Sequence, residues 1–89
     1  MEEKKIREVM KILNAWNPLG ERASTIQDLE GYRTEAIDIL FHVNSKSSES
    51  HIQKVVLKVL NEAFDLSLSR DECIDPAKRI FDLLKDELE

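Results

Sequence analysis

Two histidines, His42 and His51, are the first candidates for acid–base chemistry or metal binding, because imidazole is the side chain that titrates near neutral pH. Neither has a second histidine or a cysteine three or four residues away, the spacing that would put two metal ligands on one helical face. A phosphotransfer histidine is usually followed within its helix by a lysine and a small residue, whereas a helix end is predicted soon after His42. The pattern favours two helix-end histidines partly in solvent, with no metal and no cofactor.

The single cysteine, Cys73, excludes an internal disulfide and a zinc site built from several thiolates. A nucleophilic cysteine also needs a neighbouring base or positive charge that favours the thiolate. The flanking carboxylates of Asp71, Glu72 and Asp75 act in the opposite sense. We therefore expect Cys73 to pack with Ile74 beneath the last helix, and one reduced thiol agrees with a cytoplasmic location.

Two recognised motifs fail in the segment after the third predicted helix. A calcium loop starting at Asp65 would need glycine at its sixth position and glutamate at its twelfth, where the chain has Arg70 and Pro76. An acyl carrier protein holds its prosthetic arm on the serine of an Asp-Ser-Leu triplet that opens its second helix. Here Leu66 separates Asp65 from Ser67, and the run comes too late in the chain. With no catalytic motif found, we expect a protein that is not an enzyme.

Length and composition predict one small helical domain, residues 1–89. Hydrophobic residues make up 42% of the chain and charged residues 35%, a mixture typical of globular proteins. Two glycines and two prolines leave few residues for the tight turns of a β-sandwich or barrel. No apolar run approaches the roughly 20 residues of a membrane-spanning helix, and the charged first residues do not form a signal peptide. These features predict an all-α cytoplasmic protein that does not bind a membrane.

The negative charge is concentrated in the last third of the sequence. Residues 61–89 carry nine acidic and four basic side chains, so their net charge of −5 equals that of the whole chain. An acidic chain has the wrong sign for binding a nucleic-acid backbone, so we expect no nucleic-acid partner. An acidic surface either attracts a basic partner or keeps a small protein in solution, and the second role is commoner.

Hydrophobic residues recur at intervals of three and four positions in four segments, which predicts four helices. The first spans about 2–16 and ends at the turn 17–20, because its proline disfavours helical geometry in the residue before it. The second spans about 32–43. Its start is open, because Ser24 could cap an earlier turn whereas Gly31 interrupts any continuous helix from there.

The third predicted helix follows a polar connection in which Ser47 or Ser48 is the N-cap, and it continues for about fifteen residues to Phe64. The fourth is expected to begin at Asp75, with Pro76 at its first helical position, and to continue to Leu88. Together the segments predict a compact four-helix domain with a long first loop, at about 17–31, lying across one end.

Two segments resemble the signature of a small family of uncharacterised all-helical proteins from bacillus-type bacteria. They are Trp16–Gly20, which closes the first helix, and Tyr32–Ala36, which opens the second. The later run Phe64–Leu68, followed by acidic residues and Cys73, is also similar to that family. The resemblance implies an all-helical fold of unknown activity, so it supplies no chemistry.

The residues of that signature include our candidate partner or ligand surface, which consists of Trp16, Leu19, Tyr32 and Glu35. One interpretation is structural: the Trp16 ring and part of Tyr32 are buried. Glu35 then bonds to free amides of the preceding loop, or pairs with Arg33 or with a residue of another helix. The other is a shallow groove at Trp16, Leu19 and Tyr32, beside Glu35, that binds a peptide or a partner helix.

For function we carry two hypotheses from different classes. The first is a non-catalytic protein-interaction or regulatory module, because Ile37 and Phe41 widen the apolar arc of the second helix beyond what one core face needs. Its partner is an unidentified protein or a second copy of the chain. The second is a small-ligand-binding protein or enzyme with a pocket near Trp16, Tyr32 and Glu35.

Overall fold

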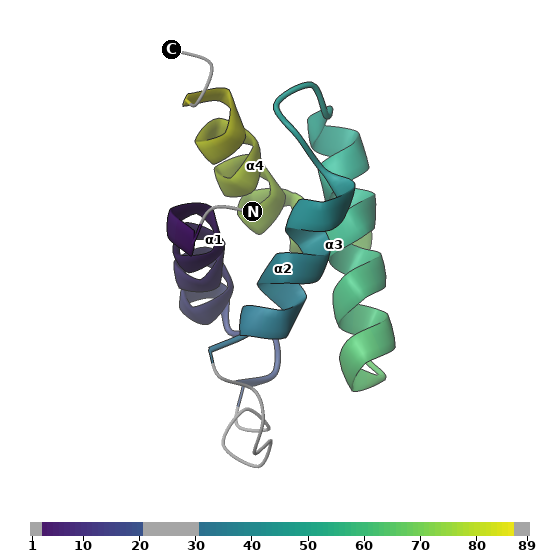
Figure 1. Ribbon diagram of the computed structural model, residues 1–89. Helices are drawn as coiled ribbons and strands as arrows, with labels where there is room; N and C mark the ends of the chain where they lie inside the picture. The colour runs from purple at the N-terminus through teal and green to yellow at the C-terminus, as the bar shows by residue number, and fades with distance from the viewer. Residues whose placement is uncertain (1–2, 21–30, 87–89) are drawn as a thin grey trace.

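The computed structural model describes residues 3–20 and 31–86 and shows four α-helices, as predicted (Figure 1). They are α1 (Glu3–Trp16), α2 (Arg33–His42), α3 (Glu49–Phe64) and α4 (Arg70–Asp86). No strand occurs within these described ranges. Residues 21–30 of the predicted first loop, including Ser24, and residues 87–89 lie outside the description.

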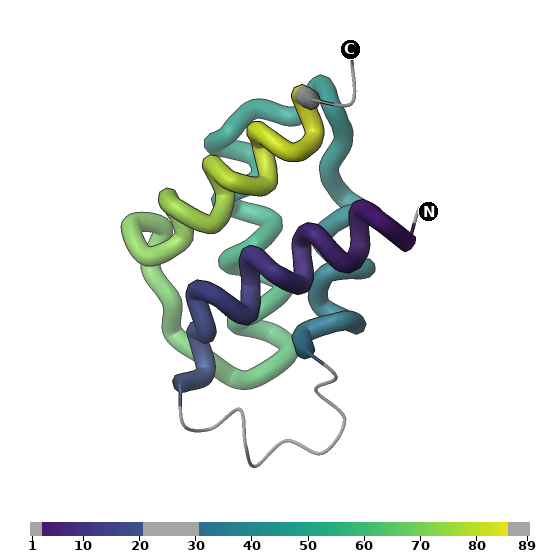
Figure 2. The backbone as a smooth tube through the Cα atoms, turned by 90° about the vertical axis from the view of Figure 1, so that its left-hand side faces the viewer, coloured from purple at the N-terminus to yellow at the C-terminus, as the bar shows by residue number. Residues whose placement is uncertain are grey.

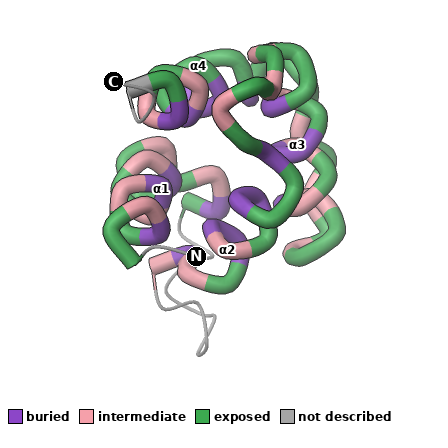
Figure 3. The backbone as a smooth tube through the Cα atoms, turned by 45° about the horizontal axis from the view of Figure 1, so that its top comes forward, coloured by how far each residue is buried: buried purple, intermediate pink, exposed green. Residues whose placement is uncertain are grey.

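Each helix packs against its neighbours in sequence, and α1 closes the arrangement by packing against α4 (Figure 1). Figure 2 shows α1 and α4 side by side, with α3 behind them. Buried residues face inward from all four helices, and the outer faces are exposed (Figure 3). Each helix contributes a row of buried residues to the core. The predicted all-α four-helix fold is confirmed.

Helix α1 packs through the predicted stripe, because Ile6, Val9 and Leu13 are all buried. The helix ends at Trp16, and Asn17 takes a left-handed backbone conformation with φ of 50°. The Asn17 amide donates to the Leu13 carbonyl at 2.7 Å, and the Gly20 amide donates to the Asn17 carbonyl at 3.0 Å. These bonds close the helix in a tight turn at the predicted position.

Helix α2 begins after two consecutive left-handed residues, Gly31 with φ of 67° and Tyr32 with φ of 66°. Gly31 is held close to α1, since the Asn14 side-chain amide donates to the Gly31 carbonyl at 2.9 Å. A Cβ atom at position 31 would stand 3.2 Å from Asn14 Nδ2 and 3.3 Å from Met10 Cε. The left-handed φ and this close approach together explain why glycine occupies the position.

Of the two predicted caps for α3, Ser48 is the one used. Its hydroxyl accepts a hydrogen bond of 3.1 Å from the His51 amide. The helix ends at Phe64, where Asp65 turns the chain in a left-handed conformation with φ of 53°. The start and the end of the third helix therefore agree with the prediction.

The predicted start of the fourth helix, at Asp75, is wrong. Helix α4 begins at Arg70, and Pro76 lies inside it, buried in the core. The Ser69 hydroxyl accepts a bond of 3.3 Å from the Glu72 amide, which satisfies a free donor of the first turn. Pro76 has no N–H to donate to the carbonyl one turn earlier, so the helix continues past it with one bond missing.

The earlier start of α4 changes the surroundings of Cys73. Its thiol is buried one turn before Ala77, as expected of a packing residue. Burial, and then the nearby Glu72 carboxylate, raises the pKa of Cys73 to about 11, which opposes a nucleophilic role. The expected partner Ile74 is 47% exposed, because successive helical residues point about 100° apart. Cys73 therefore packs in the core without Ile74.

Candidate functional site

The four residues of the predicted surface do not form one. Leu19, Tyr32 and Glu35 are buried, with exposed fractions of 5%, 1% and 8%, respectively. Trp16 is half-buried and lines a small cavity of about 60 Å³ between α1 and α4. The rest of its lining consists of Ile12, Ala15, Asp75, Pro76 and Arg79. Burial therefore corrects the expectation of an accessible groove at Leu19, Tyr32 and Glu35.

Tyr32 ties the turn after α1 to the end of α3. Its hydroxyl donates to Asn17 Oδ1 at 2.9 Å and accepts from the Leu19 amide at 3.4 Å. Its ring meets the Phe64 ring edge to face, with centroids 6.2 Å apart. Burial raises the pKa of the Tyr32 phenol, which keeps the hydroxyl protonated and able to donate. These contacts give Tyr32 a packing and positioning role.

Glu35 is the buried charged residue of the core. Its Oε1 atom is buried and has no hydrogen-bond partner within the described part of the chain. Burial, and secondarily Asp38, raises the pKa of the Glu35 carboxyl. Arg33 pairs with Glu3 instead, because its two terminal guanidinium nitrogens, Nη1 and Nη2, each donate to the Glu3 carboxylate at 2.7 Å. The expectation that Glu35 pairs with Arg33 is therefore corrected.

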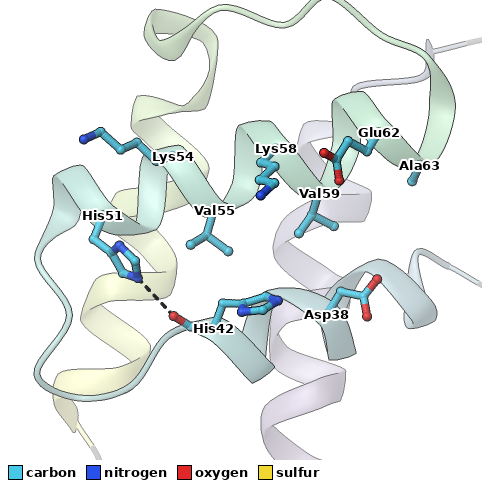
Figure 4. A pocket seen from close by; sticks show the side chains of 9 residues that line it. All are labelled: Asp38, His42, His51, Lys54, Val55, Lys58, Val59, Glu62 and Ala63. Carbon is cyan, nitrogen blue, oxygen red and sulfur yellow. Dashed lines mark hydrogen bonds between the residues drawn. The ribbon is translucent and has the colours of Figure 1, made fainter.

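A groove with a volume of about 660 Å³ lies between α2 and α3 (Figure 4). Its apolar lining comes from α3 and consists of Val55, Val59 and Ala63. Its polar lining comes from both helices and consists of Asp38, His42, His51, Lys54, Lys58 and Glu62. We call these nine residues the α2–α3 groove.

Helix α3 lines the groove because its apolar residues cover more than one face. Ile52, Val56 and Leu60 are fully buried in the core. Val55 and Val59 each precede a core residue, Val56 or Leu60, and successive helical residues point about 100° apart. Val55 and Val59 are therefore turned from the core toward α2. The width of this apolar arc, which is visible in the spacing of the five residues, was the signal in the sequence for a second face.

The two histidines meet at the end of the groove nearest the α2–α3 connection. The His51 ring donates from Nε2 to the backbone carbonyl of His42 at 3.0 Å (Figure 4). His42 lies in the last turn of α2 and His51 in the first turn of α3, and both are exposed, as predicted. Within the described residues, no group of three histidine, cysteine or acidic side chains is placed to hold a metal ion.

Phe41 lies on the solvent side of α2, next in sequence to the groove residue His42. Its side chain is 73% exposed, whereas Ile37, one turn earlier, is half-buried against the core. Phe41 lies between two groove residues in sequence, Asp38 and His42. The exposed Phe41 ring adds apolar surface to α2 next to these two groove residues. We call Phe41 together with the α2–α3 groove the docking face.

None of the four helices, over the residues described, is long and apolar enough to span a bilayer. Comparison of the chain with protein-family models, with curated proteins and with solved structures found no match.

Proposed function

We propose that this protein is a small non-catalytic cytoplasmic module that acts by binding another protein chain at the docking face. The observation that supports this most is the 73% exposure of Phe41 beside a groove whose floor is partly apolar. Grooves of this kind accept an amphipathic helix, which places apolar side chains on the floor and charges along the rim.

The dimensions of the groove agree with a helical partner. Its α3 side extends over twelve residue steps, from His51 to Ala63, which corresponds to about 18 Å or three helical turns. Lysine and acidic side chains stand on its rim, where they can set the direction of a bound helix without burying a charge. The length of the groove and the charges on its rim therefore both suit the binding of a helix.

The buried groups with raised pKa values lie outside the groove. The three buried side chains with raised pKa values, Tyr32, Glu35 and Cys73, are not in the lining of the groove. Catalysis requires perturbed groups that reach a substrate in an accessible cleft. This separation of the buried titratable groups from the accessible groove supports a binding module over an enzyme.

Site-specific photo-crosslinking in the source organism tests the proposal. A photoreactive phenylalanine analogue at position 41 should form an adduct with a protein chain, either another protein or a second copy. The matched control is position 74 on α4, since Ile74 is the other large exposed hydrophobic residue described. An absence of adducts at position 41, or the same adducts from both positions, would contradict the proposed role of the docking face.

A further inference from the structure

The charges on the docking face are separated along its length. The end near the α2–α3 connection carries His42, His51 and Lys54, and the opposite end carries Asp38 and Glu62 (Figure 4). The groove holds two lysines and two carboxylates in all, so with neutral histidines it has no net charge, although the chain carries −5. A neutral face with opposite charges at its two ends is complementary to a reversed copy of itself.

We propose that the partner on the docking face is a second copy of this chain, bound antiparallel about a two-fold axis. This inference rests on the proposed function and names its partner. The axis lies in the interface and crosses the groove at right angles, so that α3 faces α3 and α2 faces α2, each with its direction reversed. Such an arrangement is closed and uses the same surface of both copies.

The positions of the charged residues fit one such axis. On α3, the axis passes at Lys58, midway between Lys54 and Glu62, which brings Lys54 of each copy toward Glu62 of the other. On α2, it passes between Asp38 and His42, so that Asp38 of each copy faces His42 of the other. Figure 4 shows His42 opposite Val55 and Asp38 opposite Val59, so both crossing points lie near the same level of the groove. A single axis therefore satisfies both helices.

The apolar residues gather near the same axis. The half-buried Val59 of each copy lies close to the axis, and the two Phe41 side chains approach each other on the α2 side. Antiparallel packing of the two α3 helices also places the positive end of each helix dipole beside the negative end of the other. Burial of Phe41, which is 73% exposed in the single chain, supplies the apolar contact of the interface.

Lys58 opposes the association and supplies a distinctive prediction. It lies midway between Lys54 and Glu62 on the lining of the groove, so the two copies of Lys58 meet near the axis. Replacing Lys58 by methionine should tighten a dimer of this geometry, because it removes a like-charge contact. The same substitution would weaken the binding of an acidic partner that uses the two lysines.

The size of the face predicts that the dimer is weak. Helix α3 lines about 18 Å of the groove and α2, from Asp38 to His42, lines about 6 Å, so at a helix width of about 10 Å the face presents roughly 240 Å². Stable complexes commonly bury about 800 Å² on each partner. We therefore expect a dimer that forms at high protein concentration, dissociates on dilution and weakens as salt screens its charge pairs.

Sedimentation equilibrium with charge-swapped variants tests the inference. Lys54→Glu and Glu62→Lys should each weaken the homodimer about tenfold, because each places like charges together twice. An equimolar mixture of the two should recover the association. In the mixed dimer the introduced glutamate of one variant faces the introduced lysine of the other, and the unchanged Lys54 and Glu62 also face each other. Lys78→Glu and Asp82→Lys, on exposed positions of α4, reproduce the changes in net charge and should leave the association unchanged.

Three outcomes would overturn this inference: a wild-type chain that stays monomeric at millimolar concentration, charge variants that dimerise like the wild type, or a mixture that does not recover. Circular dichroism of each variant shows whether it keeps the helical fold, and Lys58→Met supplies an independent gain of association. If the chain is monomeric but position 41 still crosslinks to a different protein, the proposed function stands and only the second-copy inference fails.

Discussion

The His51 ring donates a 3.0 Å hydrogen bond from Nε2 to the backbone carbonyl of His42, which ties the first turn of α3 to the last turn of α2. The bond spans the six-residue connection 43–48 and closes one end of the α2–α3 groove. It also gives the carbonyl of His42, at a helix C-terminus, the donor that it lacks within the helix. The angle between the two helices that form the docking face therefore depends on this pair.

Removing the His51 donor should loosen that end of the groove. We expect His51→Ala to lower the free energy of unfolding by about 1 kcal/mol, the usual net contribution of one hydrogen bond. His51→Gln is the matched control, because its amide nitrogen stands close to the position of Nε2 and should keep most of the stability. Urea denaturation measures both, and an equal loss in the two variants would contradict a specific role for this bond.

The hydrogen bond between Tyr32 and Asn17 should also be measurable as a coupling free energy between the two side chains. Tyr32→Phe removes the hydroxyl that binds Asn17 Oδ1 and the Leu19 amide, so we expect a loss of about 1–2 kcal/mol in a buried setting. Asn17→Gly removes the acceptor and keeps the left-handed turn available. In a double-mutant cycle the two losses should be less than additive, and full additivity would show that the hydroxyl and the amide do not interact.

Glu35 should make the protein less stable as the pH rises. Its folded-state pKa is raised above the ordinary value of 4.5, so the folded state holds the proton more tightly than the unfolded chain does. Its contribution to stability is therefore complete below about pH 4.5 and decreases as the pH rises from there toward the folded-state pKa. We expect Glu35→Met to remove this part of the pH dependence and to be the more stable protein at pH 7.

Denaturant unfolding of the wild type and of Glu35→Met across pH 3–8 measures this effect. The difference between the two curves isolates Glu35 from Glu3, whose pKa is lowered to about 2 by Arg33 and which acts in the opposite direction at acid pH. A difference that does not grow between pH 4 and pH 7 would mean that the Glu35 carboxyl is not buried as described.

Gly20 and Gly31 form a matched pair of substitution sites that separates the cost of backbone strain from the cost of steric crowding. Both have left-handed φ values, but a Cβ atom at Gly20 would meet nothing within 4 Å, whereas one at Gly31 would press on Asn14 and Met10. We expect Gly20→Ala to cost about 1 kcal/mol from backbone strain alone, and Gly31→Ala to cost about 1 kcal/mol more. Thermal or urea unfolding measures the difference, and equal losses would contradict the close approach of Gly31 to α1.

The first three helices were predictable because their patterns are local. The 3–4 spacing of Ile6, Val9 and Leu13 and the serine cap at Ser48 are readable without knowledge of packing. The start of α4 was missed because Asp75 followed by Pro76 is typical of a helix N-terminus, and burial of Pro76 overrides that signal. Ser69 and Glu72, spaced as in a capping box, were the correct signal.

The docking face was predictable only in part. The surplus apolar arc of α2 pointed to Phe41, which is exposed. The groove itself depends on how α2 and α3 pack, and residues as far apart in sequence as Asp38 and Glu62 meet there only in the folded chain. The signature residues Tyr32 and Glu35 attracted attention by type, but their burial follows from tertiary packing that no local pattern encodes. Membership of the family that these residues resemble stays a prediction.

Association of the chain through the docking face can be measured by sedimentation equilibrium of Phe41→Ser beside the wild type and an Ile74→Ser control. Because Phe41 is 73% exposed, its loss should leave the free energy of unfolding nearly unchanged. We expect Phe41→Ser to weaken self-association at least about tenfold and Ile74→Ser to leave it unchanged. Equal association of Phe41→Ser and wild type would contradict association through this face.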